Sequence, residues 1–363
     1  MPPSDTPRQL GYRMPAEWEP HEATWLAWPH NPQDWPGKFS SIPWLYAEIV
    51  RLLAERERVH LVVAGANTQD RVTGMLRRAH ARLDNVTFHT WPTNRGWTRD
   101  SGPIFVRNAD GRVALTDWKF NAWAKYEDWQ LDDRLPARVT AVLDLPSWQP
   151  ARTLSDGTQH RVVLEGGSID VNGAGQMLTT EECLLSEVQQ RNPGLTREQL
   201  EQVFSDYLGT DQVIWLNRGI AGDDTHGHVD DIARFAAPDT VIAAVEPNVK
   251  DPNHQPLAEN LARLKAARTL DGKQFTVVEL PMPRPIVFRK QRLPASYANF
   301  YLANGVVLMP TFHDLNDRLA LNILAAAFPD RQVIGVHSVD LIWGLGALHC
   351  MTQQQPADLS GAR

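Results

Sequence analysis

Cysteine is almost absent from this sequence of 363 residues, which contains only Cys183 and Cys350. Two cysteines form at most one disulfide, and a chain of this length builds its own core, so a disulfide-stapled secreted fold is not expected. Long apolar runs are also missing, because no stretch of about 18 apolar residues could cross a membrane. Residues 1–9 are polar and proline-rich, unlike a secretory signal. We therefore expect a cytoplasmic protein with reduced thiols and no membrane partner.

Positive charge is scarce relative to negative charge. The chain has 36 Lys and Arg residues against 43 Asp and Glu residues, which gives a formal net charge of -7. No basic stripe is present to follow the phosphates of a nucleic acid, so nucleic acid is not expected as a partner. The charge favours cationic ligands, and 13 tryptophans offer rings on which a flat cation can stack.

A strand, a tight turn and a second strand recur along the chain, and this repeat predicts the fold. Hairpins are expected at residues 102–116, 167–179, 229–243 and 299–310, with a truncated one at 334–351. Helical periodicity predicts helices at 181–190, 196–208, 256–270 and 314–328. A hairpin-plus-helix unit of about 65 residues cannot bury its apolar face alone, so we expect five units around one axis.

The repeat also decides the expected domain organisation. Length alone suggests two or three domains, but a closed or stacked array indicates one α/β domain over residues 1–363, with flexible ends at 1–10 and 357–363. The N-terminal part is expected to contain strands at 23–28 and 60–64 and helices at 43–56 and 68–83, the last capped by Thr68.

Chemically active side chains stand at the mouths of the predicted hairpins. They are Asp100, Glu165, His228 with Asp230, Asn299 and Cys350. In a radial array these side chains converge on the axis. His228 and Asp230 are two residues apart and share a face in extended backbone, whereas Asp231 then points away. By the same rule His349 and Cys350 point to opposite faces, which makes His349 a poor candidate for the base.

The stretch before Cys350 is read as a tight turn. Gly344 and Gly346 remove side-chain bulk and permit unusual backbone angles. A buried structural cysteine is the ordinary alternative for a lone residue of this type. The other hairpin-mouth residues favour a reactive Cys350.

The charges of this group predict the class of substrate. Carboxylates around a thiol raise its pKa and oppose formation of the thiolate. A planar guanidinium resolves this conflict, because carboxylates bind its N–H groups and its charge favours the thiolate. We therefore expect Cys350 to attack the guanidinium carbon, His228 to protonate the departing ammonia, and water activated by His228 to hydrolyse the thiouronium intermediate.

Five motifs in this order resemble the agmatine deiminases, members of the guanidine-modifying superfamily that also contains the bacterial peptidylarginine deiminases. They are MPAEWEPH at 14–21, WTRDSGP at 97–103, EGGS at 165–168, GDDTHGHVD at 222–230 and HCMTQQ at 349–354. The resemblance covers nearly the whole chain. It differs in the turn before Cys350, which reads GLGA at 344–347 where three glycines and an Asn are common in the family.

The resemblance implies a fold, an activity and site roles. The fold is a five-bladed pseudo-symmetric α/β propeller, or pentein. Cys350 is the nucleophile, His228 the acid and base, and Asp100 and Asp230 clamp the guanidinium, while Glu165 hydrogen bonds to the guanidinium or to His228. The reaction needs no cofactor and no metal, converts agmatine to N-carbamoylputrescine and ammonia, and belongs to polyamine (putrescine) biosynthesis or agmatine catabolism. Homodimers are common among relatives.

Further residues are candidates for substrate binding, each beside an ordinary alternative. Trp97 either stacks on the ligand or packs under its hairpin. Asp223 and Asp224 either bind the substrate amine or cap a loop. Asn299 completes the set.

Three other functions stay open from the sequence. A peptidylarginine or free-arginine deiminase would use the same nucleophile. A metal-dependent amidohydrolase would use the ligand-like spacing of His226, His228, Asp230 and Asp231. A propeller scaffold without activity would keep these residues as structure.

Overall fold

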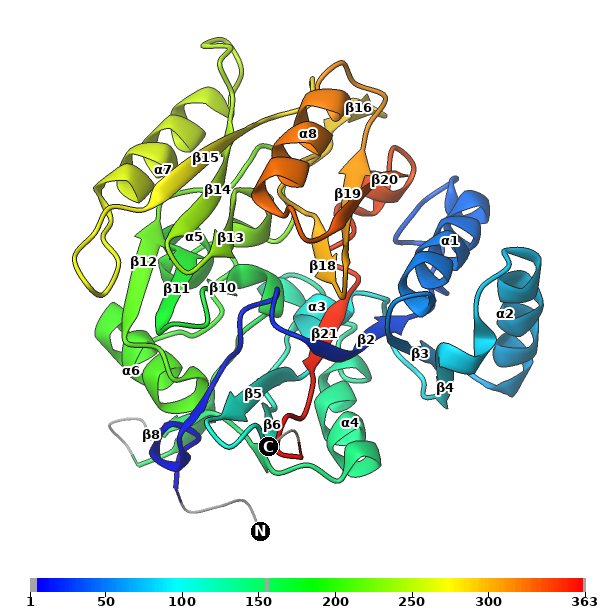
Figure 1. Ribbon diagram of the computed structural model, residues 1–363, viewed down its shortest axis with the longest axis horizontal. Helices are drawn as coiled ribbons and strands as arrows, with labels where there is room; N and C mark the ends of the chain where they lie inside the picture. Colours follow the sequence, from blue (N-terminus) through cyan, green and yellow to red (C-terminus); the bar gives the residue numbers. More distant parts are fainter. Residues whose placement is uncertain (1–4, 154–156, 362–363) are drawn as a thin grey trace.

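The computed structural model describes residues 5–153 and 157–361 (Figure 1). Residues 1–4 and 362–363, within the ends expected to be flexible, lie outside this part. Within it, Arg8 forms an ion pair with Asp211 at 2.6 Å. No helix among the described residues is long and apolar enough to span a membrane.

Three sheets share one plan, in which an antiparallel hairpin is followed by a helix and a third, parallel strand. Their strands are β10 (Asp170–Val171), β11 (Gln176–Thr180) and β12 (Gln212–Leu216); β13 (Ala233–Ala237), β14 (Thr240–Val245) and β15 (Thr276–Pro281); and β18 (Tyr301–Ala303), β19 (Val306–Thr311) and β20 (Gln332–His337). The intervening helices are α5 (Glu181–Leu185), α6 (Arg197–Leu208), α7 (His254–Ala266) and α8 (Asp317–Ala327).

Two four-stranded sheets extend this plan, with orders β1-β5-β6-β7 and β21-β2-β3-β4. Their strands are β1 (Tyr12–Arg13), β5 (Ile104–Asn108), β6 (Val113–Thr116) and β7 (Ser147–Trp148), and β2 (His21–Ala27), β3 (Arg58–Val63), β4 (Val86–Thr90) and β21 (Gln353–Pro356). Their helices are α3 (Thr98–Ser101) and α4 (Leu135–Leu143), and α1 (Ile42–Ala54) and α2 (Ala66–Arg78). Two-stranded ribbons are formed by β8 (Ala151–Thr153) with β9 (Gln159–Arg161), and β16 (Val287–Phe288) with β17 (Gln291–Arg292).

The four complete hairpins predicted from sequence are confirmed by the pairs β5–β6, β10–β11, β13–β14 and β18–β19. The truncated hairpin at 334–351 is wrong. β20 pairs in parallel with β19, and the last strand, β21, pairs antiparallel with β2 near the start of the chain. The chain ends thus share a sheet, a long-range pairing that local periodicity does not encode.

The helices follow local signals with a few differences. α6 begins after Thr196, which forms a capping box with Gln199, and ends at Gly209 in left-handed conformation. α5 is shorter than predicted and ends at Leu185. α2 begins after Gly65, so Thr68 lies inside the helix and is not its cap. The parallel strands β4, β7, β12 and β15 were not predicted, because a parallel strand pairs only across a crossover connection and carries no local turn signal.

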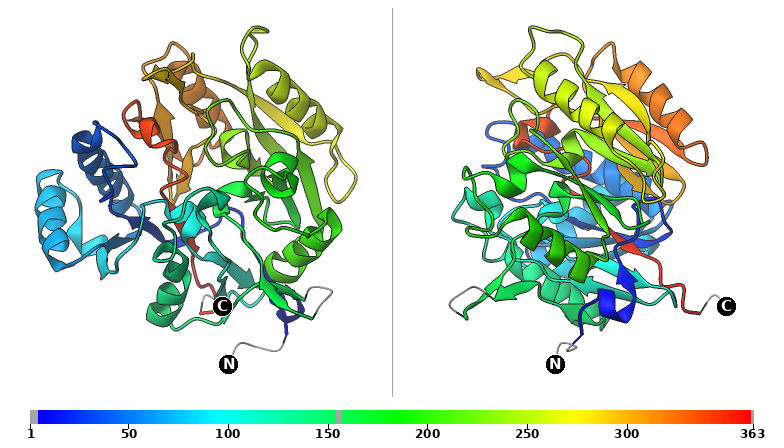
Figure 2. Two further views of the ribbon diagram at one scale, coloured as in Figure 1. Left: turned by 180° about the vertical axis from the view of Figure 1, so that it is seen from behind. Right: turned by 90° about the vertical axis from the view of Figure 1, so that its left-hand side faces the viewer.

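Figure 1 shows the larger helices on the outside of the molecule, with β10, β13, β18 and β21 toward its centre, and the view from behind agrees (Figure 2). Apolar clusters fill the space between each sheet and its helix; one joins Leu200, Val203 and Phe204 of α6 to Met177 of β11. The strands β10, β13, β18 and β21 therefore approach one another near the centre of the molecule (Figure 1). Polar side chains gather in this central region.

Arg234 of β13 ties several of these segments together, although its side chain is completely buried. Its guanidinium donates to Asp170 Oδ1 at 3.1 Å, to Glu17 Oε2 at 2.7 Å and to the Phe300 carbonyl at 2.8 Å. One cation thus compensates two buried carboxylates from different parts of the chain.

We expect Arg234→Met to lower the free energy of unfolding by about 3–5 kcal/mol, because it leaves Glu17 and Asp170 buried without their shared cation. Urea unfolding measures this. The control is Lys265→Ala, which removes the exposed ion pair with Glu279 and should change stability by less than about 1 kcal/mol. Similar small effects in both variants would contradict the role of Arg234.

Candidate active site

A narrow cavity lies beside Cys350, with a water-accessible volume of about 80 Å³. Its buried lining residues include Trp97, Asp100, Trp123 and Cys350. Its other polar and aromatic lining residues are Gln33, Asp34, Arg95, Tyr126, Asp224 and Thr225. Four of the residues expected at the site, Trp97, Asp100, Asp224 and Cys350, therefore share one cavity.

The turn before Cys350 differs from expectation in its backbone. The left-handed residue is Leu345, with φ of 67°, while Gly344 and Gly346 do not have positive φ. Gly346 is needed for close approach instead, because a Cβ there would lie 2.8 Å from the Trp97 ring and 3.1 Å from Cys350 Cβ. The glycine thus lets the indole of Trp97 pack directly against the backbone that carries Cys350.

The sulfur of Cys350 faces polar groups within a buried site. Asn299 Nδ2 lies 3.2 Å from Cys350 Sγ, and Asp230 Oδ2 lies 3.8 Å from it. Burial raises the pKa of Cys350 well above its usual value, and the charges of Asp230, Asp231 and Asp100 raise it further. This direction agrees with the expectation that the carboxylates oppose formation of the thiolate.

Three polar side chains converge over Gly167, in the EGGS motif. A Cβ at this position would lie 2.6 Å from His228 Nδ1, 2.7 Å from Asp100 Oδ1 and 3.0 Å from Asp230 Oδ2. The Gly167 N–H donates to Asp100 Oδ1 at 3.1 Å, and Trp123 Nε1 donates to Asp100 Oδ2 at 2.9 Å. Only glycine leaves room for this convergence. Burial raises the pKa of Asp100 to about 6, with Asp230 adding to the effect and His228 opposing it.

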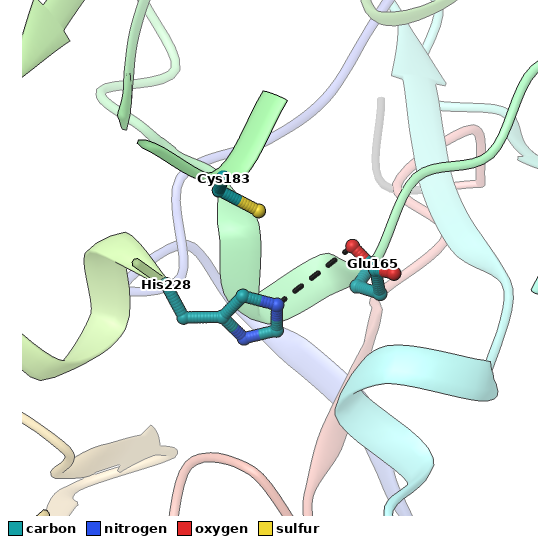
Figure 3. Close-up of side chains that lie close together, drawn as sticks. All are labelled: Glu165, Cys183 and His228. Carbon is teal, nitrogen blue, oxygen red and sulfur yellow. Dashed lines mark ion pairs between the residues drawn. The ribbon is translucent and has the colours of Figure 1, made fainter. Parts of the chain in front are cut away.

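His228 lies between two carboxylates, Asp100 and Glu165. Figure 3 shows its ring facing Glu165. Its Nδ1 is 3.8 Å from Asp100 Oδ1, and its Nε2 is 3.7 Å from Glu165 Oε2. Burial lowers the pKa of His228, but Asp100, Glu165 and the nearby Cys183 outweigh burial and raise that pKa well above its usual value. Within the described residues neither ring nitrogen has a hydrogen-bond partner. This geometry suits an imidazole that can donate a proton to a bound ligand.

Glu165 is oriented by Arg191, a partner that the sequence did not indicate. Arg191 Nε donates to Glu165 Oε1 at 3.1 Å, and both side chains are buried. Burial raises the pKa of Glu165, but Arg191 and His228 outweigh it and lower that pKa to about 2. Glu165 is therefore a fixed carboxylate whose other oxygen faces His228, and it does not line the cavity.

The metal-ligand set considered around His226 is not assembled. His226 Nε2 lies 3.2 Å from Ser186 Oγ, away from the cavity lining. Among the described residues, the group with metal-ligand atoms close together is Glu165, Cys183 and His228, within 4.8 Å of one another (Figure 3). Glu165 in that group already pairs with Arg191.

The alternation rule failed around Asp230. His228 precedes a short 3₁₀-turn, Val229–Asp231, where the backbone is not extended. Asp231 therefore does not point away: its Oδ1 accepts from Asn299 Nδ2 at 3.0 Å, the same amide that contacts Cys350. The direction expected for His349 also differs, because His349 lies in a turn and its Nδ1 is 2.7 Å from Asp230 Oδ2. The prediction that it is a poor candidate for the base is not contradicted.

Of the remaining predicted residues, Asp224 lines the cavity, whereas Asp223 and Asn299 lie outside its lining. Asp223 caps its own loop, accepting hydrogen bonds from the backbone of Thr225 and Gly227, and does not line the cavity. Asp224 lines it but is paired with Lys125 and accepts from Tyr126 Oη at 2.7 Å. Asn299 supports Cys350 from outside the lining.

Asp34 and Arg95 are cavity residues that sequence reasoning missed. Arg95 pairs with Asp34 and, at 3.0 Å, with Asp128, and it stacks on Tyr126 with 4.4 Å between guanidinium and ring centre. Asp34 Oδ2 is buried and has no hydrogen-bond partner among the described residues. Neither residue lies in a motif, and their proximity to Cys350 depends on contacts across hundreds of positions.

The chain is similar to known proteins over nearly its whole length. The sequence model of the Porphyromonas-type peptidyl-arginine deiminase family matches residues 13–356. The agmatine deiminase of Pseudomonas aeruginosa (strain UCBPP-PA14) is 36% identical, with 98% of each chain covered.

Solved structures give the same picture. An agmatine deiminase of Enterococcus faecalis superposes with a TM-score of 0.87 at 33% identity, covering 98% of each chain. A cysteine-to-serine variant of C. jejuni agmatine deiminase, solved with substrate bound, superposes with a TM-score of 0.83 at 30% identity, covering 96% of this chain and 97% of that one. The mixed α/β fold and the resemblance inferred from the motifs are confirmed, and this chain belongs to the Porphyromonas-type peptidyl-arginine deiminase family.

Proposed function

We propose that this protein hydrolyses the guanidinium of agmatine to give N-carbamoylputrescine and ammonia, without a cofactor. The observation that supports this proposal most directly is that the side chains of Asp100, His228 and Asp230 converge over Gly167, beside the Cys350 sulfur. This set has the carboxylates to bind a guanidinium and a thiol to attack it. The agmatine deiminases among its relatives support the choice of substrate.

In the first half-reaction the guanidinium binds between Asp100 and Asp230. Its positive charge offsets the carboxylates that keep Cys350 protonated, so the thiol releases its proton to solvent as the substrate binds. The sulfur attacks the guanidinium carbon to form a neutral tetrahedral adduct. Protonated His228 gives its proton to one amino group, ammonia leaves, and a thiouronium cation remains on Cys350.

In the second half-reaction water attacks the thiouronium carbon. His228, now neutral, accepts one proton from that water, which gives a neutral tetrahedral adduct. The C–S bond then breaks, the remaining proton of the added hydroxyl passes to the departing sulfur, and the ureido product leaves with Cys350 restored as a thiol. Glu165, held by Arg191, keeps its charge beside His228 and favours the imidazolium. The net change consumes one water and releases one ammonia for each guanidinium.

The outer part of the cavity favours an amine-ended substrate. Asp34 has a buried oxygen without a partner among the described residues, and Asp224 lies on the same cavity lining. The one cation of that lining, Arg95, is already paired with Asp34 and Asp128. A substrate carboxylate, as in free arginine, would find acids there and no free cation.

Broader expectations accompany this function. The five sheets of three or four strands would be the blades of a pentein propeller in one domain over residues 1–363, closed by the β21–β2 pairing. A homodimer, a cytoplasmic location and a place in polyamine synthesis or agmatine catabolism stay predictions. Free-arginine or peptidylarginine deimination is the second candidate, because it needs the same nucleophile, acid and base, and carboxylates around the guanidinium.

Ammonia release from agmatine, arginine, a peptidyl-arginine and guanidinobutyrate tests the function directly. We expect release from agmatine, reduced by at least about 10³-fold in Cys350→Ser, because the serine hydroxyl is a weaker nucleophile. The control is Lys265→Ala, which removes an exposed ion pair and should retain turnover. Release from arginine or peptidyl-arginine alone would overturn the substrate, and no release from any guanidine would overturn the activity.

The raised pKa of Asp100 predicts an acid limit to activity. Only the ionised carboxylate pairs with a guanidinium, so kcat/KM for agmatine should fall as pH drops through about 6. Asp100→Asn should lose about 100-fold or more in kcat/KM at neutral pH and keep the wild-type unfolding curve. A flat profile from pH 5 to 7, or normal turnover in the variant, would contradict the clamp.

Asp34→Asn tests recognition of the amine. We expect kcat/KM for agmatine to fall about 10- to 100-fold, the worth of one hydrogen bond to a charged group. Activity on arginine should rise relative to agmatine, because Arg95 loses a partner. The matched control is Asp128→Asn, which touches the same Arg95 but does not line the cavity. An unchanged substrate preference in Asp34→Asn would remove this role.

A further inference from the structure

We propose that His349, held in place by Glu17, is a positioning residue for Asp230 and orients that carboxylate toward the guanidinium. The inference rests on the proposed function, in which Asp230 is one of the two clamps. It assigns a purpose to two motif residues that the reaction steps leave unused: the histidine next to Cys350 and the glutamate of MPAEWEPH.

The first observation is the bonding of the His349 ring, which is 1% exposed. Nδ1 lies 2.7 Å from Asp230 Oδ2, and Nε2 lies 2.7 Å from Glu17 Oε2. Both ring nitrogens are therefore occupied by carboxylate partners, so neither is free to act as a base toward a substrate.

The second observation is that Glu17 is itself immobilised. Arg234 Nη2 donates to Glu17 Oε2 at 2.7 Å, and Arg99 Nη2 lies 3.6 Å from the same oxygen. The Leu302 N–H donates to Glu17 Oε1 at 2.8 Å. Three separate segments thus hold Glu17, and through it the outer nitrogen of His349.

The third observation is the state of Asp230, which is fully buried. Its Oδ2 is bound by His349 and lies 3.8 Å from Cys350 Sγ. Its Oδ1 has no hydrogen-bond partner in the described part of the chain. Bonding through Oδ2 fixes the rotation of the carboxylate and leaves Oδ1 available to a guanidinium N–H. Without His349, the carboxylate would be free to rotate or take up a proton.

The test compares two reagents that alkylate Cys350. Chloroacetamidine is cationic and planar and needs the clamps, whereas iodoacetamide is neutral and needs only the thiol. In wild type we expect chloroacetamidine to be strongly preferred. In His349→Ala its rate at Cys350 should fall at least tenfold, while the iodoacetamide rate changes less than threefold. His349→Gln, which keeps one donor toward Asp230, should lie between the two and covers a failure of the alanine variant to fold.

The matched control is another buried histidine with a carboxylate partner, His21, which lies 3.4 Å from Glu57. His21→Ala should leave the ratio of the two rates unchanged, even if it lowers stability. A ratio unchanged in both His349 variants would overturn the positioning role, and the proposed function would stand. Failure of the function itself has a different signature, namely no preference for chloroacetamidine and no ammonia from agmatine in wild type, and it would overturn the positioning role as well.

Discussion

Compensation of buried carboxylates is the constraint on which the centre of this protein depends. A carboxylate removed from water is stable only beside a cation or several donors. Glu165 has Arg191, Asp170 has Arg234, and Asp230 has His349. In the part of the chain that the structure describes, Asp100 has only the N–H groups of Gly167 and Trp123 within hydrogen-bond distance, with His228 farther away at 3.8 Å, and burial raises its pKa to about 6. An added cation is therefore favourable beside Asp100, on the same cavity lining as the thiol.

In the proposed mechanism the same electrostatics keeps Cys350 protonated, and therefore less nucleophilic, until a substrate binds. A permanently activated thiolate would need cations around it, whereas this thiol is surrounded by acids that raise its pKa. A guanidinium supplies the missing charge at the moment that the thiolate is required. The same carboxylates would then select a cationic guanidinium and keep the thiol protonated when no substrate is bound.

The ends of the chain meet at this centre. Pairing of β21 with β2 brings the segment that carries Cys350 beside the segment that carries Glu17, and the bond between His349 and Glu17 joins them again. Formation of the site thus depends on contacts between segments that are far apart in the sequence, such as the pair His349 and Glu17, which are separated by 332 residues.

The sequence by itself determined the local elements and the chemical types at the site. Hairpin turns such as Asn172-Gly173, the Thr196 capping box and the order of Asp100, Glu165, His228 and Cys350 depend on neighbours a few positions away. Only the tertiary structure decided which charges meet. The Arg191 and Arg234 pairs, the cavity oxygen of Asp34 and the orientation of His349 and Asp231 depend on contacts between distant segments. Alternation along a strand misplaced the last two, because both lie in turns, where side-chain direction follows tertiary packing and not a period of two.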